Sequence, residues 1–129
     1  MKKYVLLVLF VICMVSCSNY YVTRKPKALI GSWERTVKQN KTEFTARLTF
    51  NEDLTFSFVV KDPNVGHINT HGDVSIMSKK IAFLSDIQCN SAGIYKYYIE
   101  YNKTLILKLE NDMCKSRKNV IDGVWTRVK

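Results

Sequence analysis

Phe44-Thr-Ala-Arg-Leu-Thr-Phe50, Asn51-Glu-Asp53 and Leu54-Thr-Phe-Ser-Phe-Val-Val60 are consecutive segments that decide the fold class. Apolar side chains alternate with mostly polar ones on both sides of the short polar segment. Because successive side chains of a β-strand point to opposite faces, this alternation predicts two half-buried strands. The segment between them has the length and composition of a hairpin loop. We therefore predict an antiparallel hairpin here.

The same period of two continues outward in both directions. A second hairpin is predicted over Gly93–Leu109, with its tight turn at Asn102-Lys103. Four further strands complete the pattern: Leu29–Val37, Gly72–Met77, Lys80–Ser85 and Asp122–Val128. From residue 29 onward no window has the spacing of a capped amphipathic helix. We predict an all-β domain, a small eight-stranded antiparallel up-and-down barrel, because closure removes the exposed edges of such a sheet.

The first and last predicted strands carry the same short pattern, Gly-x-Trp-x-Arg. Its residues are Gly31, Trp33 and Arg35 in the first strand, and Gly123, Trp125 and Arg127 in the last. On a strand these three positions share one face. If the strands are neighbours in a closed barrel, a tryptophan and a guanidinium from opposite strands can stack, which contributes about 0.5–2 kcal/mol. A chance match of a short pattern is the alternative.

The order of motifs along the domain resembles that of a known group of barrels. An early Gly-x-Trp, with a late Arg that can pack over it, is similar to the lipocalins and the wider calycin group. The second half resembles bacterial lipocalin-like domains on Cys89, Gly93-Ile-Tyr95, Leu105-Ile-Leu107, Asp112-Met-Cys114-Lys-Ser-Arg117 and Gly123-Val-Trp125. The resemblance covers about Leu29 to Lys129. It implies the barrel fold and a general capacity to bind, without a particular substrate.

The start of the chain has the plan of a secretory signal peptide. Met1-Lys-Lys3 is a positive segment, and Tyr4–Val15 is apolar but shorter than the roughly 20 residues that span a bilayer. Met14-Val-Ser-Cys17 resembles the lipobox of bacterial lipoproteins, with Met and Val where Leu and a small residue are usual. The resemblance implies that Cys17 is acylated and becomes the mature N-terminus. A plain signal peptide cleaved nearby is the alternative.

We therefore divide the chain into a lipoprotein signal peptide (1–16), a lipidated cysteine with a basic tether (17–28) and a lipocalin-like barrel domain (29–129). The chain has 129 residues and a net charge of +9, which raises the question of a polyanionic partner. Five positive residues precede the barrel domain: Lys2, Lys3, Arg24, Lys25 and Lys27. Arg24, Lys25 and Lys27 of the tether are suited to contact anionic lipid headgroups; the alternative is that the tether is a solvated linker. We expect a lipid-anchored protein of the bacterial cell envelope that faces the periplasm or the cell surface.

Two cysteines, Cys89 and Cys114, remain in the exported domain. Export to an oxidising compartment favours a disulfide between them. A redox-active or metal-binding pair is the alternative, but the chain has no Cys-x-x-Cys. We predict a structural disulfide.

Other chemistry is not indicated. The sequence has neither a Gly-x-Ser-x-Gly elbow nor a phosphate-binding glycine-rich loop, so we expect no enzymatic activity and no cofactor. His67 and His71 lie among loop-forming residues and are expected to be exposed rather than to bind a metal. The basic residues are scattered along the strands, so nucleic acid is not an expected partner.

Two functions stay open, and the barrel interior separates them. The predicted inward residues are bulky: Trp33, Phe44, Leu48, Phe50, Phe56, Phe58, Val74, Ile76, Ile81, Phe83, Tyr95, Tyr97, Ile99, Leu105, Leu107, Leu109 and Trp125. One function is binding of a small apolar or amphipathic ligand, with pocket residues Phe56, Phe58, Tyr95 and Tyr97. The other is an interaction module or periplasmic inhibitor-type barrel with a filled interior, which offers the loops 61–70 and 111–120 to an envelope protein. A cavity above roughly 300 Å³ would favour the ligand.

Overall fold

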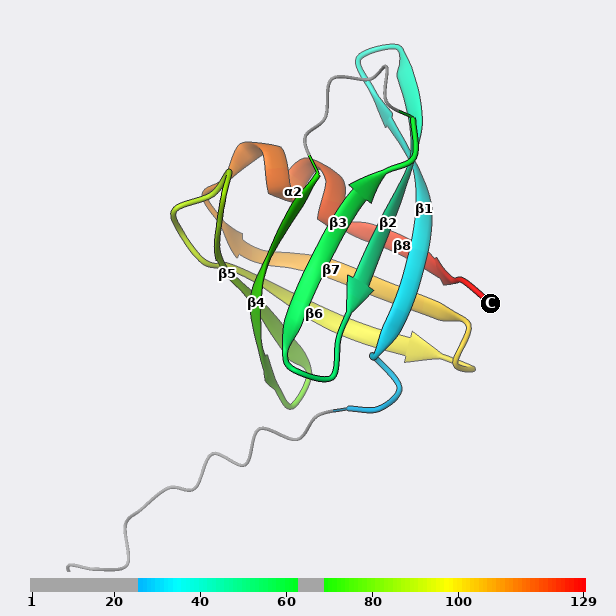
Figure 1. Ribbon diagram of the computed structural model, residues 1–129, viewed down its shortest axis with the longest axis vertical. Helices are drawn as coiled ribbons and strands as arrows, with labels where there is room; N and C mark the ends of the chain where they lie inside the picture. The colour runs from blue at the N-terminus through cyan, green and yellow to red at the C-terminus, as the bar shows by residue number, and fades with distance from the viewer. Residues whose placement is uncertain (1–25, 63–68) are drawn as a thin grey trace, which may run out of the picture.

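The computed structural model describes residues 26–62 and 69–129 (Figure 1). Its strands are β1 (Gly31–Gln39), β2 (Thr42–Phe50), β3 (Thr55–Val60), β4 (Thr70–Met77), β5 (Lys80–Asp86), β6 (Gly93–Glu100), β7 (Thr104–Asp112) and β8 (Gly123–Arg127). Each strand pairs antiparallel with the next, and β8 pairs with β1. The predicted closed, eight-stranded up-and-down barrel is therefore confirmed.

The predicted lipidation site, Cys17, and the signal peptide lie outside the described residues, as does His67. Within the described ranges, no helix has the length and apolar character needed to cross a bilayer.

The hairpin of β2 and β3 forms as the alternation predicts. Leu48 pairs with Phe58 and Phe50 pairs with Phe56, which places these apolar side chains together in the core. β3 begins one residue later than predicted, because Leu54 has a φ of 65° and belongs to the turn. The Asp53 carboxylate accepts a hydrogen bond from the backbone N–H of Thr55 (3.1 Å) and so ends the turn.

The turn between β6 and β7 lies one residue earlier than predicted. Tyr101 and Asn102 have φ values of 50° and 54°, and the N–H of Lys103 donates to the carbonyl of Glu100 (3.0 Å). Two successive residues with positive φ match the twist of a hairpin. The central pair is therefore Tyr101-Asn102 rather than Asn102-Lys103.

The all-strand prediction was wrong for one segment. Where we expected a loop over 111–120, β7 continues to Asp112 and a short helix, α2 (Lys115–Ile121), follows. α2 lies at one end of the barrel (Figure 1). Its buried residues, Arg117, Val120 and Ile121, have the spacing of one helix face. Because the first residue of that face is an arginine, the sequence does not show the apolar spacing that indicates a helix.

The interior is filled by the barrel's own side chains. The largest buried ones are Trp33, Trp125, Tyr95, Phe50, Phe56, Phe83, Leu29, Leu48, Ile81, Leu105, Leu107 and Ile121. Phe83 makes edge-to-face contacts with Phe56 and Tyr95, with ring centroids 4.9 and 5.5 Å apart. Leu109 was wrongly expected inside and is 41% exposed, because a β-bulge between β6 and β7 interrupts the alternation there.

Candidate functional site

The two Gly-x-Trp-x-Arg copies meet where the barrel closes. Trp33 pairs with Arg127 across β1 and β8. The Arg127 guanidinium lies 4.1 Å from the centroid of the Trp33 ring, and the Arg35 guanidinium lies 5.5 Å from that of Trp125. Each arginine therefore covers the tryptophan of the opposite strand.

Both guanidinium groups are also occupied by backbone carbonyls. Arg127 donates to Ile30 (3.0 Å), to Asn102 (2.8 Å) and to Ala28. Arg35 donates to Val120 (3.1 Å) and to Asp122. With these donors engaged, the arginines hold the barrel closed rather than offer a binding site.

The glycines of the two copies make room for these arginines. Gly31 and Gly123 have φ values of 120° and 144°, which side chains of L-residues rarely allow. A Cβ on Gly31 would lie 3.0 Å from Nη1 of Arg127, and one on Gly123 would overlap the guanidinium of Arg35. All six motif residues thus belong to one closing structure, which we call the clasp.

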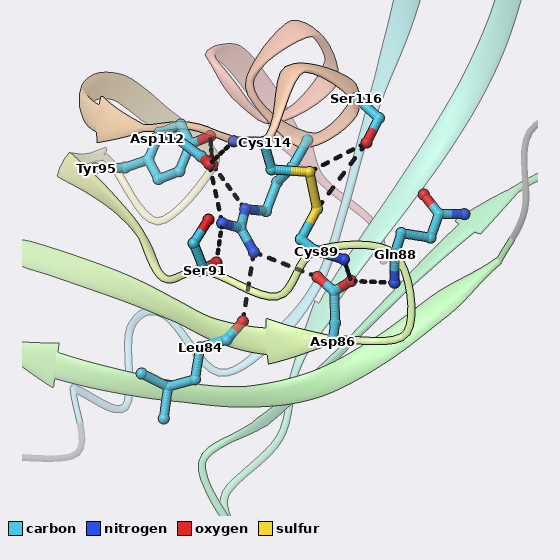
Figure 2. Close-up of polar contacts among 10 residues, drawn as sticks. Leu84, Asp86, Gln88, Cys89, Ser91, Tyr95, Asp112, Cys114 and Ser116 are labelled. Atoms are coloured by element: carbon cyan, nitrogen blue, oxygen red, sulfur yellow. Dashed lines mark hydrogen bonds and ion pairs between the residues drawn. A yellow bond between two sulfur atoms is a disulfide. The ribbon is translucent and has the colours of Figure 1, made fainter.

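A disulfide joins the loop after β5 to the start of α2. Cys89 and Cys114 are bonded, with their Cα atoms 5.7 Å apart, so the predicted pairing is confirmed (Figure 2). The Asp86 carboxylate accepts from the N–H of Cys89 (2.9 Å) and the Asp112 carboxylate from that of Cys114 (2.8 Å). An aspartate two or three residues earlier therefore positions each cysteine.

A buried ion pair lies beside this disulfide. Arg117 is 6% exposed and donates to Asp112 through Nε (2.6 Å) and Nη2 (2.9 Å). Its remaining donors reach the carbonyls of Leu84 (3.3 Å) and Ser91 (2.6 Å) and the carboxylate of Asp86 (3.4 Å), and the Tyr95 hydroxyl donates to Asp112 (2.6 Å), as Figure 2 shows. Such a pair is tolerated in a protein interior only when the other polar atoms are also satisfied. We call the disulfide and this network the clamp.

The charges of the clamp are fixed around neutral pH. Burial by itself raises the pKa of Asp112, but hydrogen bonds from Arg117, Tyr95 and the Cys114 N–H outweigh it and hold the pKa below its usual value. Burial, reinforced by the hydrogen bond to Asp112, raises the pKa of the Tyr95 phenol. Arg117 stays cationic because Asp112 offsets its burial and raises its pKa. The network is therefore suited to holding structure rather than to exchanging protons.

A small cavity of about 40 Å³ lies against the clamp. Its lining residues are Phe56, Phe58, Thr70, Asp86, Gln88, Cys89, Ser116, Arg117, Val120 and Ile121. This volume holds about three waters at roughly 10–15 Å³ each, whereas ligand sites measure about 300–1,000 Å³. Of the four residues that we expected around a ligand, Phe56 and Phe58 line the cavity. The other two do not line it: the Tyr95 hydroxyl donates a hydrogen bond to Asp112, and the Tyr97 hydroxyl donates one to the Ser78 carbonyl (3.1 Å).

Two exposed apolar side chains flank the clamp. Ile87 is 70% exposed two residues before Cys89, and Met113 is 83% exposed directly before Cys114. Because each is within two residues of a disulfide cysteine, the clamp fixes the backbone that presents it. Neither residue was predicted from the sequence, and neither was the pairing of Arg117 with Asp112. The signal was the Asp-x-Cys-x-x-Arg spacing and an apolar residue close before each cysteine.

His71 is exposed on β4, opposite Ser57 of β3. Over the two described ranges, no group of three or more His, Cys, Asp or Glu side chains is arranged to hold a metal ion.

The barrel is consistent with a lipocalin-like fold. No protein-family model matches the sequence, and no curated protein matches it either.

Proposed function

We propose that the chain is an exported, lipid-anchored envelope protein that binds a protein partner through the clamp end of its barrel. The observation that carries this proposal is the filled interior, whose 40 Å³ cavity is far smaller than a ligand site, while two larger hollows, of about 360 and 480 Å³, are broad depressions open to solvent on the outside of the barrel. Carriage of a small apolar ligand, the other function that the sequence leaves open, needs a space that Trp33, Tyr95 and Trp125 fill.

The clamp end is the surface best suited to a partner. Ile87 and Met113 are large apolar side chains held in solvent, and methionine is enriched in protein interfaces relative to the rest of the surface. The disulfide and Arg117 order their backbone before binding, so less conformational entropy is lost in the complex. This action resembles that of a periplasmic inhibitor-type barrel and involves no catalysis.

Two features support export and anchoring. The first 17 residues have the plan of a lipoprotein signal peptide with Cys17 as the acylated residue. A Cys89–Cys114 disulfide suits the oxidising compartment that such a signal addresses. The resemblance to bacterial lipocalin-like domains agrees with this location.

Photo-cross-linking in living cells tests the proposed surface. We expect a photoreactive phenylalanine analogue at Ile87 or Met113 to form the same discrete protein adduct. The matched control is Met77, another exposed methionine (45%), at the far end of β4. An adduct at Met77 of equal yield would contradict the assignment.

Native mass spectrometry of the barrel purified from its own cells tests the filled interior. We expect the mass of the polypeptide without a bound small molecule. A stoichiometric lipid-like mass that is lost on unfolding would favour ligand carriage instead.

A further inference from the structure

The outer face of β6, β7 and β8 carries an apolar row. Tyr98 pairs with Ile106, and Ile106 pairs with Val124, so the three side chains lie next to one another on adjacent strands. Tyr98 is 43% exposed and Val124 is 57% exposed. On an antiparallel sheet, the face turned away from the core is ordinarily polar. Packing in the core therefore does not explain why these three positions are apolar.

Lysines flank this row. Lys108 lies with Nζ 5.8 Å from the centroid of the Tyr98 ring, and Lys103 is exposed in the β6–β7 turn. Among the described residues, neither lysine forms an ion pair, and Glu110 is engaged with Lys80 (2.8 Å). Glu100 is the acidic residue of β6 on this side, opposite Thr104. Apolar and cationic side chains thus dominate the surface.

The turn at the tip of this hairpin presents an aromatic ring to solvent. Tyr101 is 93% exposed and has a φ of 50°. This conformation is uncommon for an aromatic residue, whereas the following Asn102 is a type that adopts it readily. The hairpin turn accounts for this φ value, but the barrel gains no packing from the ring, so a tyrosine held in solvent here suits a role in binding.

The tip is fastened to the residues that follow the tether. Arg127 donates to the carbonyl of Asn102 in the turn and to those of Ala28 and Ile30 at the start of the barrel. The N–H of Arg127 also donates to the carbonyl of Lys103 (2.8 Å). Figure 1 shows the β6–β7 turn on the same side of the barrel as the end of β8. The tip therefore lies at the end of the barrel from which the tether leaves.

We propose that this hairpin surface, formed by Tyr98, Tyr101, Lys103, Ile106, Lys108 and Val124, docks on an anionic lipid membrane. Aromatic rings at headgroup level, aliphatic side chains and unpaired lysines together match the charge and polarity of that interface. The proposal rests on the lipid anchor at Cys17: a tether of residues 17–28 extends at most about 40 Å, which keeps this end near the bilayer. The clamp surface then faces away, towards the protein partner.

Fluorescence quenching in lipid vesicles tests the docking. The Tyr101→Trp variant of the full mature chain is placed in brominated phosphatidylcholine vesicles with or without phosphatidylglycerol. Trp33 and Trp125 are buried in the core and give a constant background. The matched control is Val59→Trp, at an exposed position (38%) of β3, on the opposite side of the eight-stranded barrel.

We expect at least a twofold stronger quenching of the added tryptophan at position 101 than at position 59, and only in vesicles with phosphatidylglycerol. Lys103→Glu combined with Lys108→Glu should abolish the difference. If both variants unfold at the temperature of the unsubstituted protein and the tryptophans at 101 and 59 are equally quenched or not quenched, the proposal is overturned, and the hairpin is left as a protein-binding face. The intact mass reports acylation of Cys17 separately. A protein mass without acyl groups would refute the lipid anchor. Quenching of the added tryptophan by vesicles mixed with this unacylated protein would still test the docking.

Discussion

The two Gly-x-Trp-x-Arg copies are built alike but have different surroundings. In both, the indole N–H donates to the carbonyl four residues earlier at 3.0 Å: Leu29 for Trp33 and Ile121 for Trp125. The first copy follows a simple turn in which the N–H of Leu29 donates to Pro26 (2.9 Å). The second follows α2, which the clamp fixes. The two copies thus share one closing geometry, and the clamp lies beside the second copy alone, where Arg35 also reaches the carbonyl of Val120 in α2.

This difference predicts that a lesion in the clamp costs more stability than a matched lesion in the clasp. The carboxylate of Asp112 is buried with Arg117, whereas the carbonyls bound by Arg35 and Arg127 carry no net charge. An unpaired buried charge is more unfavourable than an unpaired carbonyl. The following changes are ordered from the largest expected effect to the smallest.

Arg117→Met should destabilise most, by about 3–5 kcal/mol, because it leaves the carboxylates of Asp112 and Asp86 buried without their cation. Urea unfolding followed by tryptophan fluorescence measures the loss. Adding Asp112→Asn should recover part of it, since the uncompensated charge disappears. A loss below about 1 kcal/mol for Arg117→Met would show that the pair is not important for stability.

Replacing both cysteines of the Cys89–Cys114 bond by serine should cost about 3.5 kcal/mol in the chain-entropy description of a loop of 25 residues. Hydrogen exchange should rise in α2 while the amides around Trp33 keep their relative protection. Uniform loss of protection across the barrel would mean that the clamp and the clasp are one cooperative unit.

Within the clasp, Arg127→Ala should cost about 2 kcal/mol and Arg35→Ala about 1 kcal/mol. Arg127 stacks closer to its tryptophan and binds three carbonyls, whereas burial lowers the pKa of Arg35 and makes its charge less favourable. Thermal unfolding of the two single variants gives the order. The reverse order would show that the cavity left beside Gly123 outweighs the stack.

The smallest effect, at most about 0.7 kcal/mol over the first half pH unit above pH 10, should appear on raising the pH. The Tyr95 phenol has a raised pKa, so above about pH 10 it ionises in the unfolded chain before it does in the barrel. Stability from this group is complete below that pH and falls above it, by at most about 1.4 kcal/mol per pH unit. Tyr95→Phe should flatten the alkaline slope of unfolding free energy against pH. An unchanged slope would assign it to other groups, among them Tyr97, whose pKa burial also raises.

The sequence was sufficient for most of the barrel because its two-residue period is strong. The strands on either side of the Asn51–Leu54 turn alternate with Val59 as the one apolar residue on their outer face, and the repeated motif indicates which strands meet. The helix α2 was not predicted because its buried face begins with Arg117. An arginine is buried here only because it pairs with Asp112 at the end of β7. Likewise, Leu109 looks like a core residue until the bulge changes the register.

The candidate site was less predictable for a related reason. The expectation of export, together with the two cysteines that remain after residue 28, was enough to predict their pairing. The sequence also indicated bulky inward residues. It did not indicate that the Tyr95 hydroxyl donates its hydrogen bond to Asp112, where we had expected Tyr95 to line a ligand pocket. Exposure of Ile87 and Met113 depends on how the loops pack, and residue type alone points the other way.

Pairing of Trp33 with Arg127 also constrains the order of events during folding. Neighbouring hairpins can form as soon as their residues are available, but the seam between β1 and β8 joins residues more than 90 positions apart. Such a high contact order favours folding in milliseconds to seconds rather than microseconds. Until β8 arrives, β1 and β7 are open edges that can pair with another molecule. A chain whose synthesis stalls before Gly123 is therefore expected to be prone to aggregation through these open edges, which the finished barrel lacks.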